Sequence, residues 1–221
     1  MTGAQKAYKG LAMEGPIATW YTKNTGRDLR RFTTMAQGIA QRIPRDCRVL
    51  EVAPGPGYLS IELAKRGYVV TALDISRSFV HIARDNAAAA GVHVDVQLGN
   101  ASSMPLHDAS FDFIVCAAAF KNFSDPVGAL NEMHRVLTVG GQASIFDLRK
   151  DAGADAIETE IRGMNLSTVN AWVTRVIFRF GLLRAAYTNA QMQAMAMQSR
   201  FGCCDIASDG IGLEMRLEKT V

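Results

Sequence analysis

Two glycines lie where a strand pattern changes into a helical pattern. The segment VLEVAPGPGYLSIELAKRG, residues 49 to 67, begins with strand-like apolar residues and continues with helical spacing, and Gly55 and Gly57 lie at the joint. A residue without a Cβ lets a ligand lie against the backbone, and the next helix offers unpaired N–H groups and a positive dipole end. The joint predicts a ligand-binding turn, with a plain tight turn as the alternative.

An acidic residue follows the next strand pattern. Asp74 ends the strand-like part of YVVTALDI, residues 68 to 75. In an open α/β sheet the carboxyl ends of parallel strands border the ligand crevice, where a carboxylate can accept hydrogen bonds from both hydroxyls of a ribose. The glycines and Asp74 together therefore predict a nucleoside-containing cofactor.

The spacing of the glycines bears on which cofactor this is. A dinucleotide-binding turn reads G-x-G-x-x-G, and its third glycine allows the helix to pack closely. Counting from Gly55, that third position is occupied by Ser60. A nicotinamide-dependent oxidoreductase is therefore a disfavoured alternative.

Two charged residues lie just past the fifth strand pattern. Asp147 and Arg149 occupy the same kind of position as Asp74, at the carboxyl end of a predicted strand. This position makes them candidates for contact with a bound substrate. The alternative is a surface ion pair.

These residues need an alternating sheet and helix framework to bring them together. Strands are expected at 48–53, 68–75, 92–99, 111–118 and 142–148, and helices at 57–66, 77–90 and 126–137. Nearly continuous apolar strands that alternate with helices predict a parallel sheet covered on both faces, with right-handed crossovers. The pattern therefore indicates a doubly wound, Rossmann-like α/β fold.

The pattern changes after residue 150. Residues 169–178 have helical periodicity, and Thr188 is a candidate N-cap for the helix that follows it. The segment CCDIASDGIGLEMRLEK alternates around Asp209 and Gly210, which predicts a hairpin. We expect a single domain over 1–221 with a seven-stranded, mostly parallel sheet, a C-terminal antiparallel hairpin and a helical cap.

Composition narrows the classes of partner and compartment. The 221 residues carry a net charge of +3, which is too small to argue for nucleic acid. The four cysteines show no CxxC spacing, and the four histidines show no metal-ligand spacing, so no metal is expected. The sequence shows no signal peptide or run of 18 apolar residues, so a cytoplasmic protein is expected. The oligomeric state stays open.

One long segment has basic residues and no acidic ones. Between Ile161 and Cys204 there is no Asp or Glu, and Arg175 and Arg179 are four residues apart on a predicted helix. Like charges at this spacing destabilise a helix unless an anion binds or the side chains extend into water. We therefore hypothesise an apolar acceptor with an anionic group, or a transient contact with an anionic membrane surface; a solvated helix face is the alternative.

The line LEVAPGPGYLSIELAKRGYVVTALDIS resembles the first two motifs of class I S-adenosylmethionine-dependent methyltransferases. Glu51, Gly55 and Gly57 match their pattern of an acidic residue followed by alternating glycines, and Ala53 replaces the first glycine. That replacement is expected to be tolerated if Ala53 keeps a negative φ. Residues 48–148 as a whole resemble the ubiquinone/menaquinone C-methyltransferase-like branch.

The resemblance implies a set of cofactor contacts. Glu51 would hold the methionine ammonium of S-adenosylmethionine, and Asn100 would accept a hydrogen bond from the adenine amino group. Ala101 would offer its backbone N–H to the adenine, and Ala117 would face the methionine part. The glycine backbone would face the methionine and ribose. The full set expected at the cofactor is Glu51, Ala53, Gly55, Gly57, Asp74, Ile75, Asn100, Ala101 and Ala117.

The resemblance also directs attention to the segment FKNF, residues 120 to 123. In quinone-type methyltransferases a basic residue followed by Asn often lies beside the acceptor, and here these residues are Lys121 and Asn122. Lys121 would stabilise an enolate or phenolate, or accept a proton if burial lowers its pKa. The alternative is a solvated loop lysine.

By resemblance the N-terminal residues, 1–45, form a helical lid over the cofactor, and 150–187 form a helical cap over the acceptor. Tyr21 is the candidate in the lid, because its ring could face the sulfonium and its hydroxyl could bond the methionine carboxylate or the acceptor. Its packing onto the core is the alternative. Lys121, Asn122, Asp147 and Tyr21 are therefore the candidate catalytic residues.

The expected activity is methyl transfer from S-adenosylmethionine to a small, apolar or anionic organic acceptor. Carbon, oxygen, nitrogen and sulfur acceptors all stay open, because the sequence specifies the donor site better than the acceptor site. A non-catalytic cofactor-binding partner subunit is the alternative that is not an enzyme.

Overall fold

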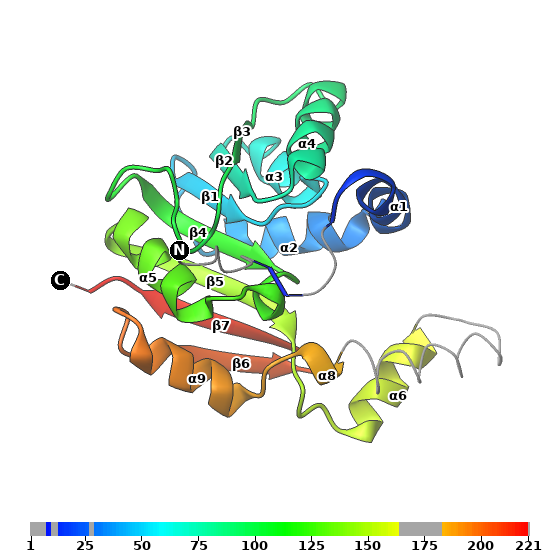
Figure 1. Ribbon diagram of the computed structural model, residues 1–221, viewed down its shortest axis with the longest axis vertical. Helices are drawn as coiled ribbons and strands as arrows, with labels where there is room; N and C mark the ends of the chain where they lie inside the picture. Colours follow the sequence, from blue (N-terminus) through cyan, green and yellow to red (C-terminus); the bar gives the residue numbers. More distant parts are fainter. Residues whose placement is uncertain (1–7, 10–12, 27–28, 164–182, 221) are drawn as a thin grey trace, which may run out of the picture.

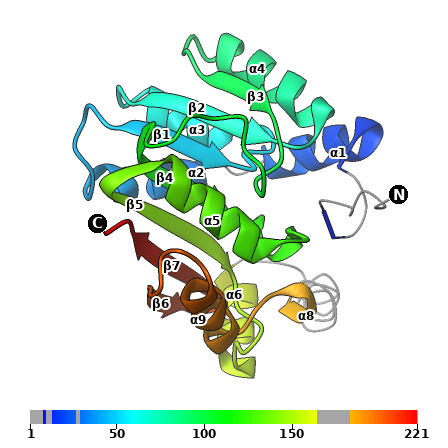
Figure 2. The same cartoon turned by 60° about the vertical axis from the view of Figure 1, so that its left-hand side comes forward.

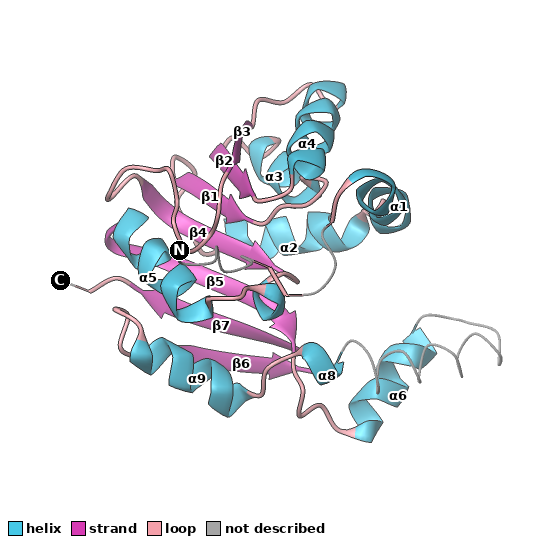
Figure 3. Cartoon of the chain, in the orientation of Figure 1, coloured by secondary structure: helices cyan, strands magenta, loops and turns pink. Residues whose placement is uncertain are grey.

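The computed structural model describes residues 8–9, 13–26, 29–163 and 183–220. Its centre is a seven-stranded sheet with the order β3-β2-β1-β4-β5-β7-β6 (Figures 1 and 3). The first five strands pair in parallel, and β7 pairs antiparallel with both β5 and β6. The sheet therefore has the predicted form, mostly parallel with a C-terminal antiparallel hairpin.

The elements alternate along the chain as the sequence predicts. The strands are β1 Arg48–Val52, β2 Val69–Asp74, β3 Asp95–Leu98, β4 Phe111–Ala117, β5 Leu137–Leu148, β6 Asp205–Asp209 and β7 Gly212–Glu218. The helices are α1 Gly15–Thr25, α2 Arg30–Ala40, α3 Tyr58–Ala64, α4 Arg77–Ala89, α5 Pro126–Val136, α6 Ala154–Gly163, α8 Leu183–Ala185 and α9 Asn189–Gln198, with a 3-10 turn, η1, at Phe120–Asn122. None of the helices among the described residues is long and apolar enough to cross a bilayer.

Alternate strand residues point to opposite faces, and each face has its own helical layer. Val49, Val70 and Phe113 pack in the cluster that α2, α3 and α4 cover. On the other face, Leu50, Ile114 and Ile145 join the cluster that α5 and α9 cover. Figures 1 and 2 show these two layers on opposite sides of the sheet. The strands are apolar on both faces because both faces are buried.

Two local predictions in the C-terminal part are confirmed. The Thr188 hydroxyl accepts from the Gln191 N–H, and Gln191 returns a side-chain bond to the Thr188 N–H, which completes a capping box at α9. The hairpin follows the alternating pattern, with Asp209 paired to Gly212 and Gly210 at φ 53° in the turn. The predicted helical segment at 169–178, with Arg175 and Arg179, lies outside the described residues.

Two strand boundaries differ from the prediction. β3 is shorter than expected, because residues 92–94 pack before the ladder to β2 begins. β5 starts at Leu137 rather than at residue 142, since Leu137 already pairs with Phe111 before an irregularity in the ladder. Gly140 and Gly141 lie in this early part of β5, and glycines weaken a strand signal in sequence.

Candidate functional site

The glycine joint follows β1 directly. Ala53 donates its N–H to the Leu73 carbonyl at 2.8 Å and then turns with φ 57°. The expectation that Ala53 keeps a negative φ is therefore wrong. A residue with a Cβ in this conformation costs about 1–2 kcal/mol, so the turn after β1 forms with some backbone strain.

The two glycines of the joint have different neighbours. A Cβ on Gly55 would lie 3.9 Å from Tyr21 Cε1 and 4.0 Å from Phe79 Cζ, so it would fill the space that these rings border. A Cβ on Gly57 would lie 3.0 Å from the Ala83 Cβ in α4. The missing side chain of Gly55 therefore leaves open the space between the Tyr21 and Phe79 rings, which we call the cradle. The missing side chain of Gly57 also lets α3 begin against α4, and its contact with the cofactor stays a prediction.

Asp74 ties the end of β2 to the glycine joint. Its Oδ2 accepts from the Gly55 N–H at 3.0 Å, and its Oδ1 accepts from the Ser76 N–H at 2.8 Å. Burial raises the pKa of Asp74 to about 6, against the effect of these two hydrogen bonds. Each carboxylate oxygen has a further lone pair, so Asp74 can still accept hydroxyl donors beside Gly55.

Glu51 lies under the same joint, in β1. It is buried and accepts a hydrogen bond from the Ser60 hydroxyl at the start of α3. Burial raises the pKa of Glu51 to about 7, although Ser60 stabilises the charged form. A dinucleotide-binding turn would have its third glycine at position 60, and in this chain the Ser60 side chain occupies that position and bonds the Glu51 carboxylate. A cation bound beside Glu51 would favour its charged form.

Three residues predicted at the cofactor lie beyond β2 and β3. Ile75 directly follows β2 and is 42% exposed, an apolar side chain available for a flat ring. Asn100 and Ala101 are half-buried, and the Asn100 Oδ1 accepts from the Ser102 N–H at 3.0 Å. The amide oxygen of Asn100 therefore holds its own turn and has one lone pair left for a ligand.

Lys121 and Asp147 meet at the ends of β4 and β5. Lys121 Nζ lies 2.8 Å from Asp147 Oδ1 and 2.8 Å from the Ala118 carbonyl, and the Lys121 N–H donates to Asp147 Oδ2 at 2.9 Å. The two side chains are only 9% and 4% exposed. Both sequence alternatives, a solvated loop lysine and a surface pair for Asp147, are therefore wrong. Arg149 does form the surface kind of pair, with Asp151.

An N-terminal segment crosses this part of the site. Tyr8 bridges to Phe123, and the Lys9 N–H donates to the Asn122 carbonyl at 2.8 Å. The Lys9 ammonium also donates to the Tyr187 hydroxyl at 2.6 Å. Sequence reasoning missed Lys9 and Tyr187 because they are 178 positions apart and no local pattern joins them.

Tyr8 is half-buried where it pairs with Phe123. Burial is the main cause of the raised pKa of its phenol, and the negative charges that add to it belong to Tyr21, Asp74 and Asp147. The acids at the ends of β2 and β5 therefore both act on the Tyr8 phenol. Tyr8 belongs to the segment predicted as a lid, and it was not singled out there as a site residue.

Tyr21 extends from α1 towards the joint. Its ring lies edge-on to Phe79, with 5.7 Å between centroids. The residues before α1 bind the start of α4, because Glu14 accepts from the N–H groups of Arg77 and Ser78 and the Met13 carbonyl accepts from the Ser76 hydroxyl. This role of Glu14 was not predicted from the sequence. The one local signal for it was its place directly before α1, where acidic residues are favoured.

The predicted site residues thus occupy one edge of the sheet. In Figure 1 the arrowheads of the parallel strands point to the side where α1 lies. Ala117 ends β4 at the same edge, between the glycine joint and the Lys121–Asp147 pair. Among the described residues, no group of three His, Cys, Asp or Glu side chains could hold a metal ion.

The comparisons with known proteins agree on the kind of domain. Residues 50–145 match the family model described as a methyltransferase domain. The demethylmenaquinone methyltransferase of Deinococcus radiodurans is 39% identical over 119 residues, 53% of this chain and 48% of that protein. The Thermus thermophilus enzyme of the same name is 33% identical over 124 residues, 55% and 56% of the two chains. The chain spans about half the length of these relatives.

Solved structures show the same fold. A putative S-adenosyl-L-methionine-dependent methyltransferase from Methanococcus maripaludis superposes with a TM-score of 0.73 at 21% identity, over 99% of this chain and 98% of that one. A methyltransferase from Aquifex aeolicus gives 0.63 at 16%, over 87% and 99%. Residues 50–145 therefore match a methyltransferase domain, and the chain has the fold of solved methyltransferase structures and is similar to demethylmenaquinone methyltransferases over about half of its length.

Proposed function

We propose that this chain transfers a methyl group from S-adenosylmethionine to a small, apolar acceptor of the quinol or phenol type. One arrangement carries the proposal: Asp74 bonded to the Gly55 N–H lies at the same sheet edge as the buried Lys121–Asp147 pair. The relatives named demethylmenaquinone methyltransferases support a quinone-type acceptor.

The residues at the joint fit the donor. The space beside Gly55 is the cradle that a Cβ would fill, and Asp74 has lone pairs for ribose hydroxyls next to it. Glu51, buried below, provides a carboxylate for the methionine ammonium. Ile75 offers an apolar surface to the adenine, with Asn100 and Ala101 at its edge.

S-adenosylmethionine, when bound, supplies a methyl group already activated by a sulfonium. The protein then needs mainly to position the acceptor and exclude water. Lys121 uses two donors on Asp147 and the Ala118 carbonyl, and its third N–H is the one proposed to stabilise a developing acceptor oxyanion. Asp147 holds Lys121 in place, and Asn122 is proposed to orient the acceptor. The Tyr21 ring is proposed to face the sulfonium.

Larger parts of the chain have proposed roles as well. We assign the helical lid to residues 1–45 and the cap over the acceptor to 150–187, within one domain over 1–221. The contact with an anionic membrane surface depends on Arg175 and Arg179, so charge reversal of both should lower liposome binding if that contact occurs. The proposed compartment is the cytoplasm.

The two alternatives are less well supported. Ser60 bonds Glu51 in place of the third glycine that a nicotinamide dinucleotide needs. A partner subunit without activity would not need a buried lysine and carboxylate at the acceptor edge, because burying such a pair seldom adds stability.

The test is a transfer assay with methyl-labelled S-adenosylmethionine and a panel of quinols, phenols, thiols and prenylated acids. We expect label in the quinol or phenol products and loss of that label in the Asp74→Ala variant. Binding of NAD in preference to S-adenosylhomocysteine would overturn the proposal in favour of an oxidoreductase. Binding of S-adenosylhomocysteine without transfer to any acceptor would favour the partner subunit.

A further inference from the structure

A pocket lies beyond the end of β5, and its lining residues differ from the site residues described above. It has a volume of about 330 Å³ and lies between the start of α6, residues 150 to 152 and α8. Ile157 and Leu183 are buried and form its apolar floor. This volume is in the range of pockets that hold small ligands or a part of them.

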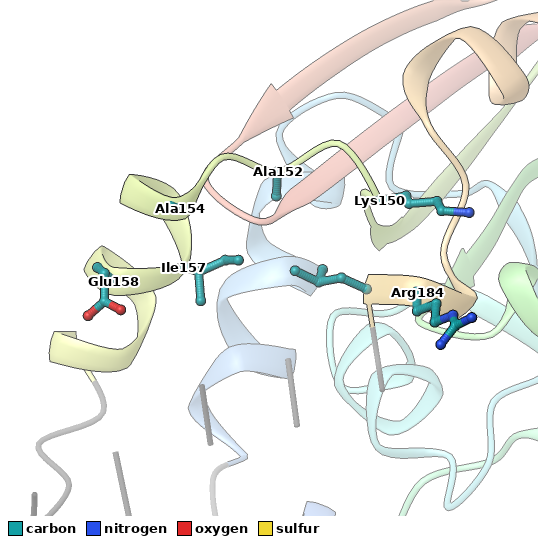
Figure 4. Close-up of a pocket in the computed structure, with 7 residues that line it drawn as sticks. Lys150, Ala152, Ala154, Ile157, Glu158 and Arg184 are labelled. Carbon is teal, nitrogen blue, oxygen red and sulfur yellow. The ribbon is translucent and has the colours of Figure 1, made fainter. Parts of the chain in front are cut away.

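The polar groups of this pocket are mainly basic at one end. Figure 4 shows Lys150 and Arg184 together on the side away from α6, with Glu158 at the opposite end beyond Ile157. Neither Lys150 nor Arg184 forms an ion pair with an acidic residue in the part of the chain that the structure describes. An ammonium and a guanidinium beside an apolar floor are suited to a carboxylate or phosphate on an apolar ligand.

Tyr187 connects this pocket to the candidate acceptor site. Its backbone carbonyl accepts from the Lys150 N–H at 2.9 Å, which fixes the chain at the pocket end. Its ring packs against Phe120, the neighbour of Lys121, with 6.2 Å between centroids. Lys150 follows Asp147 by three residues, so their Cα atoms lie within about 10 Å of each other, at most the reach of three extended residues. The backbone at this end of the pocket therefore lies within the length of a small molecule from Asp147.

We propose that this pocket is the subsite for an anionic group of the acceptor, a carboxylate or phosphate held by Lys150 and Arg184. The acceptor would then have a reacting ring at Lys121 and an acidic group at Lys150 and Arg184, joined by a short apolar chain. This inference rests on the proposed function and narrows its substrate class. It also distinguishes this chain's acceptor from a neutral one that carries only an apolar tail.

The test measures binding, with the protein saturated in S-adenosylhomocysteine. The probes are ω-(4-hydroxyphenyl)alkanoates of graded chain length, their neutral methyl esters, and the matching alkyl phosphates. The variants are Lys150→Met, Arg184→Met and the double variant. Arg45→Met is the matched control, because it removes one exposed positive charge just before β1, at the opposite edge of the sheet.

We expect one chain length of the acid to bind at least tenfold more tightly than its ester. Each single variant should lose about tenfold of that preference, as for a charge-assisted hydrogen bond, while Arg45→Met keeps it. A stronger response to the phosphates would identify phosphate as the group, and a stronger response to the acids would identify carboxylate.

Equal binding of acid and ester, no binding of any probe, or a preference that survives in the double variant would overturn the subsite. These outcomes are separate from a failure of the proposed function. The wild-type protein must bind S-adenosylhomocysteine before any probe is added, and absence of that binding counts against the methyltransferase rather than against the subsite.

Discussion

Lys121 and Asp147 form a buried ion pair in the half of the site that we propose binds the acceptor. A buried ion pair seldom adds net stability, but removal of one partner leaves an uncompensated buried charge. A single substitution of Lys121 therefore has two effects at once. Turnover falls because the ammonium is lost, and stability falls because the Asp147 carboxylate is left buried without a partner. A second substitution can separate these effects.

We predict that Lys121→Met lowers turnover by about a hundredfold at saturating substrates, by comparison with other single electrostatic groups, and leaves S-adenosylhomocysteine affinity nearly unchanged. It should also lower the melting temperature. The double variant Lys121→Met with Asp147→Asn should recover part of the lost stability, because it removes the unpaired buried charge and its amide oxygen still accepts one of the two backbone N–H groups, but it should not recover turnover.

The control for this prediction is Lys65→Met, which removes an exposed lysine paired with Glu62. Wild-type turnover in the folded Lys121 variant would leave the lysine with a structural role only. A loss of S-adenosylhomocysteine affinity as large as the loss of turnover would instead indicate that η1 lines the cofactor site.

The pKa of Glu51, about 7, predicts that donor binding depends on pH. The methionine ammonium favours charged Glu51, so S-adenosylhomocysteine affinity should fall as the pH is lowered from about 8 to 6, and binding should release protons below pH 7. Calorimetry in two buffers of different ionisation enthalpy measures this release. A pH-independent affinity, or the same profile in Glu51→Gln, would contradict the assignment of Glu51.

The effect of Glu51 on folding has the opposite sign. Its pKa is raised from 4.5 in the free side chain, so between about pH 4.5 and 7 the native protein binds more protons than the unfolded chain. Glu51 therefore lowers the free energy of unfolding as the pH rises through this window, and a bound cation at Glu51 should reverse that loss.

The turn between β1 and α3 contains the strained Ala53 and the open space beside Gly55 that we propose for the donor. We predict that Ala53→Gly raises the free energy of unfolding by about 1 kcal/mol, because glycine removes the left-handed strain and costs less than that in entropy. Urea unfolding measures the change, with Ala88→Gly in α4 as a control that should destabilise. A loss of stability in Ala53→Gly would show that the turn is not strained.

The two glycines of this turn should respond differently to the same substitution. Gly55→Ala should weaken S-adenosylhomocysteine by at least tenfold, because its Cβ enters the cradle between Tyr21 and Phe79. Gly57→Ala should mainly lower stability, since its Cβ meets Ala83, and adding Ala83→Gly should recover part of that loss. Equal effects of the two substitutions on affinity would refute the distinction.

Sequence patterns predicted the elements that depend on local chemistry. The joint at Gly55, the acid at Asp74 and the Thr188 cap each follow from a short pattern whose physical cause is local. The φ of Ala53 could not be predicted, because alanine disfavours it and only the β1–β2 ladder imposes it. The burial of Lys121 was missed for a similar reason, since its partner comes from another strand.

The arrangement of the chain brings remote segments to one edge of the sheet. Tyr8 and Lys9 from the N-terminus, Lys121 from η1 and Tyr187 from before α9 meet there through contacts over long sequence separations. Such contacts leave no periodic signal in sequence. The parallel strands and their switch in order position them, which is why the fold was predictable and this cluster was not.

Every proposed step depends on binding of the donor at Asp74, so calorimetric titration of S-adenosylhomocysteine is the decisive measurement. We predict a single binding site in the wild-type protein, at least tenfold weaker binding in Asp74→Ala, and unchanged binding in Asp85→Ala, which removes an exposed carboxylate from α4. Wild-type affinity in a folded Asp74→Ala variant, or no binding to the wild-type protein, would contradict it.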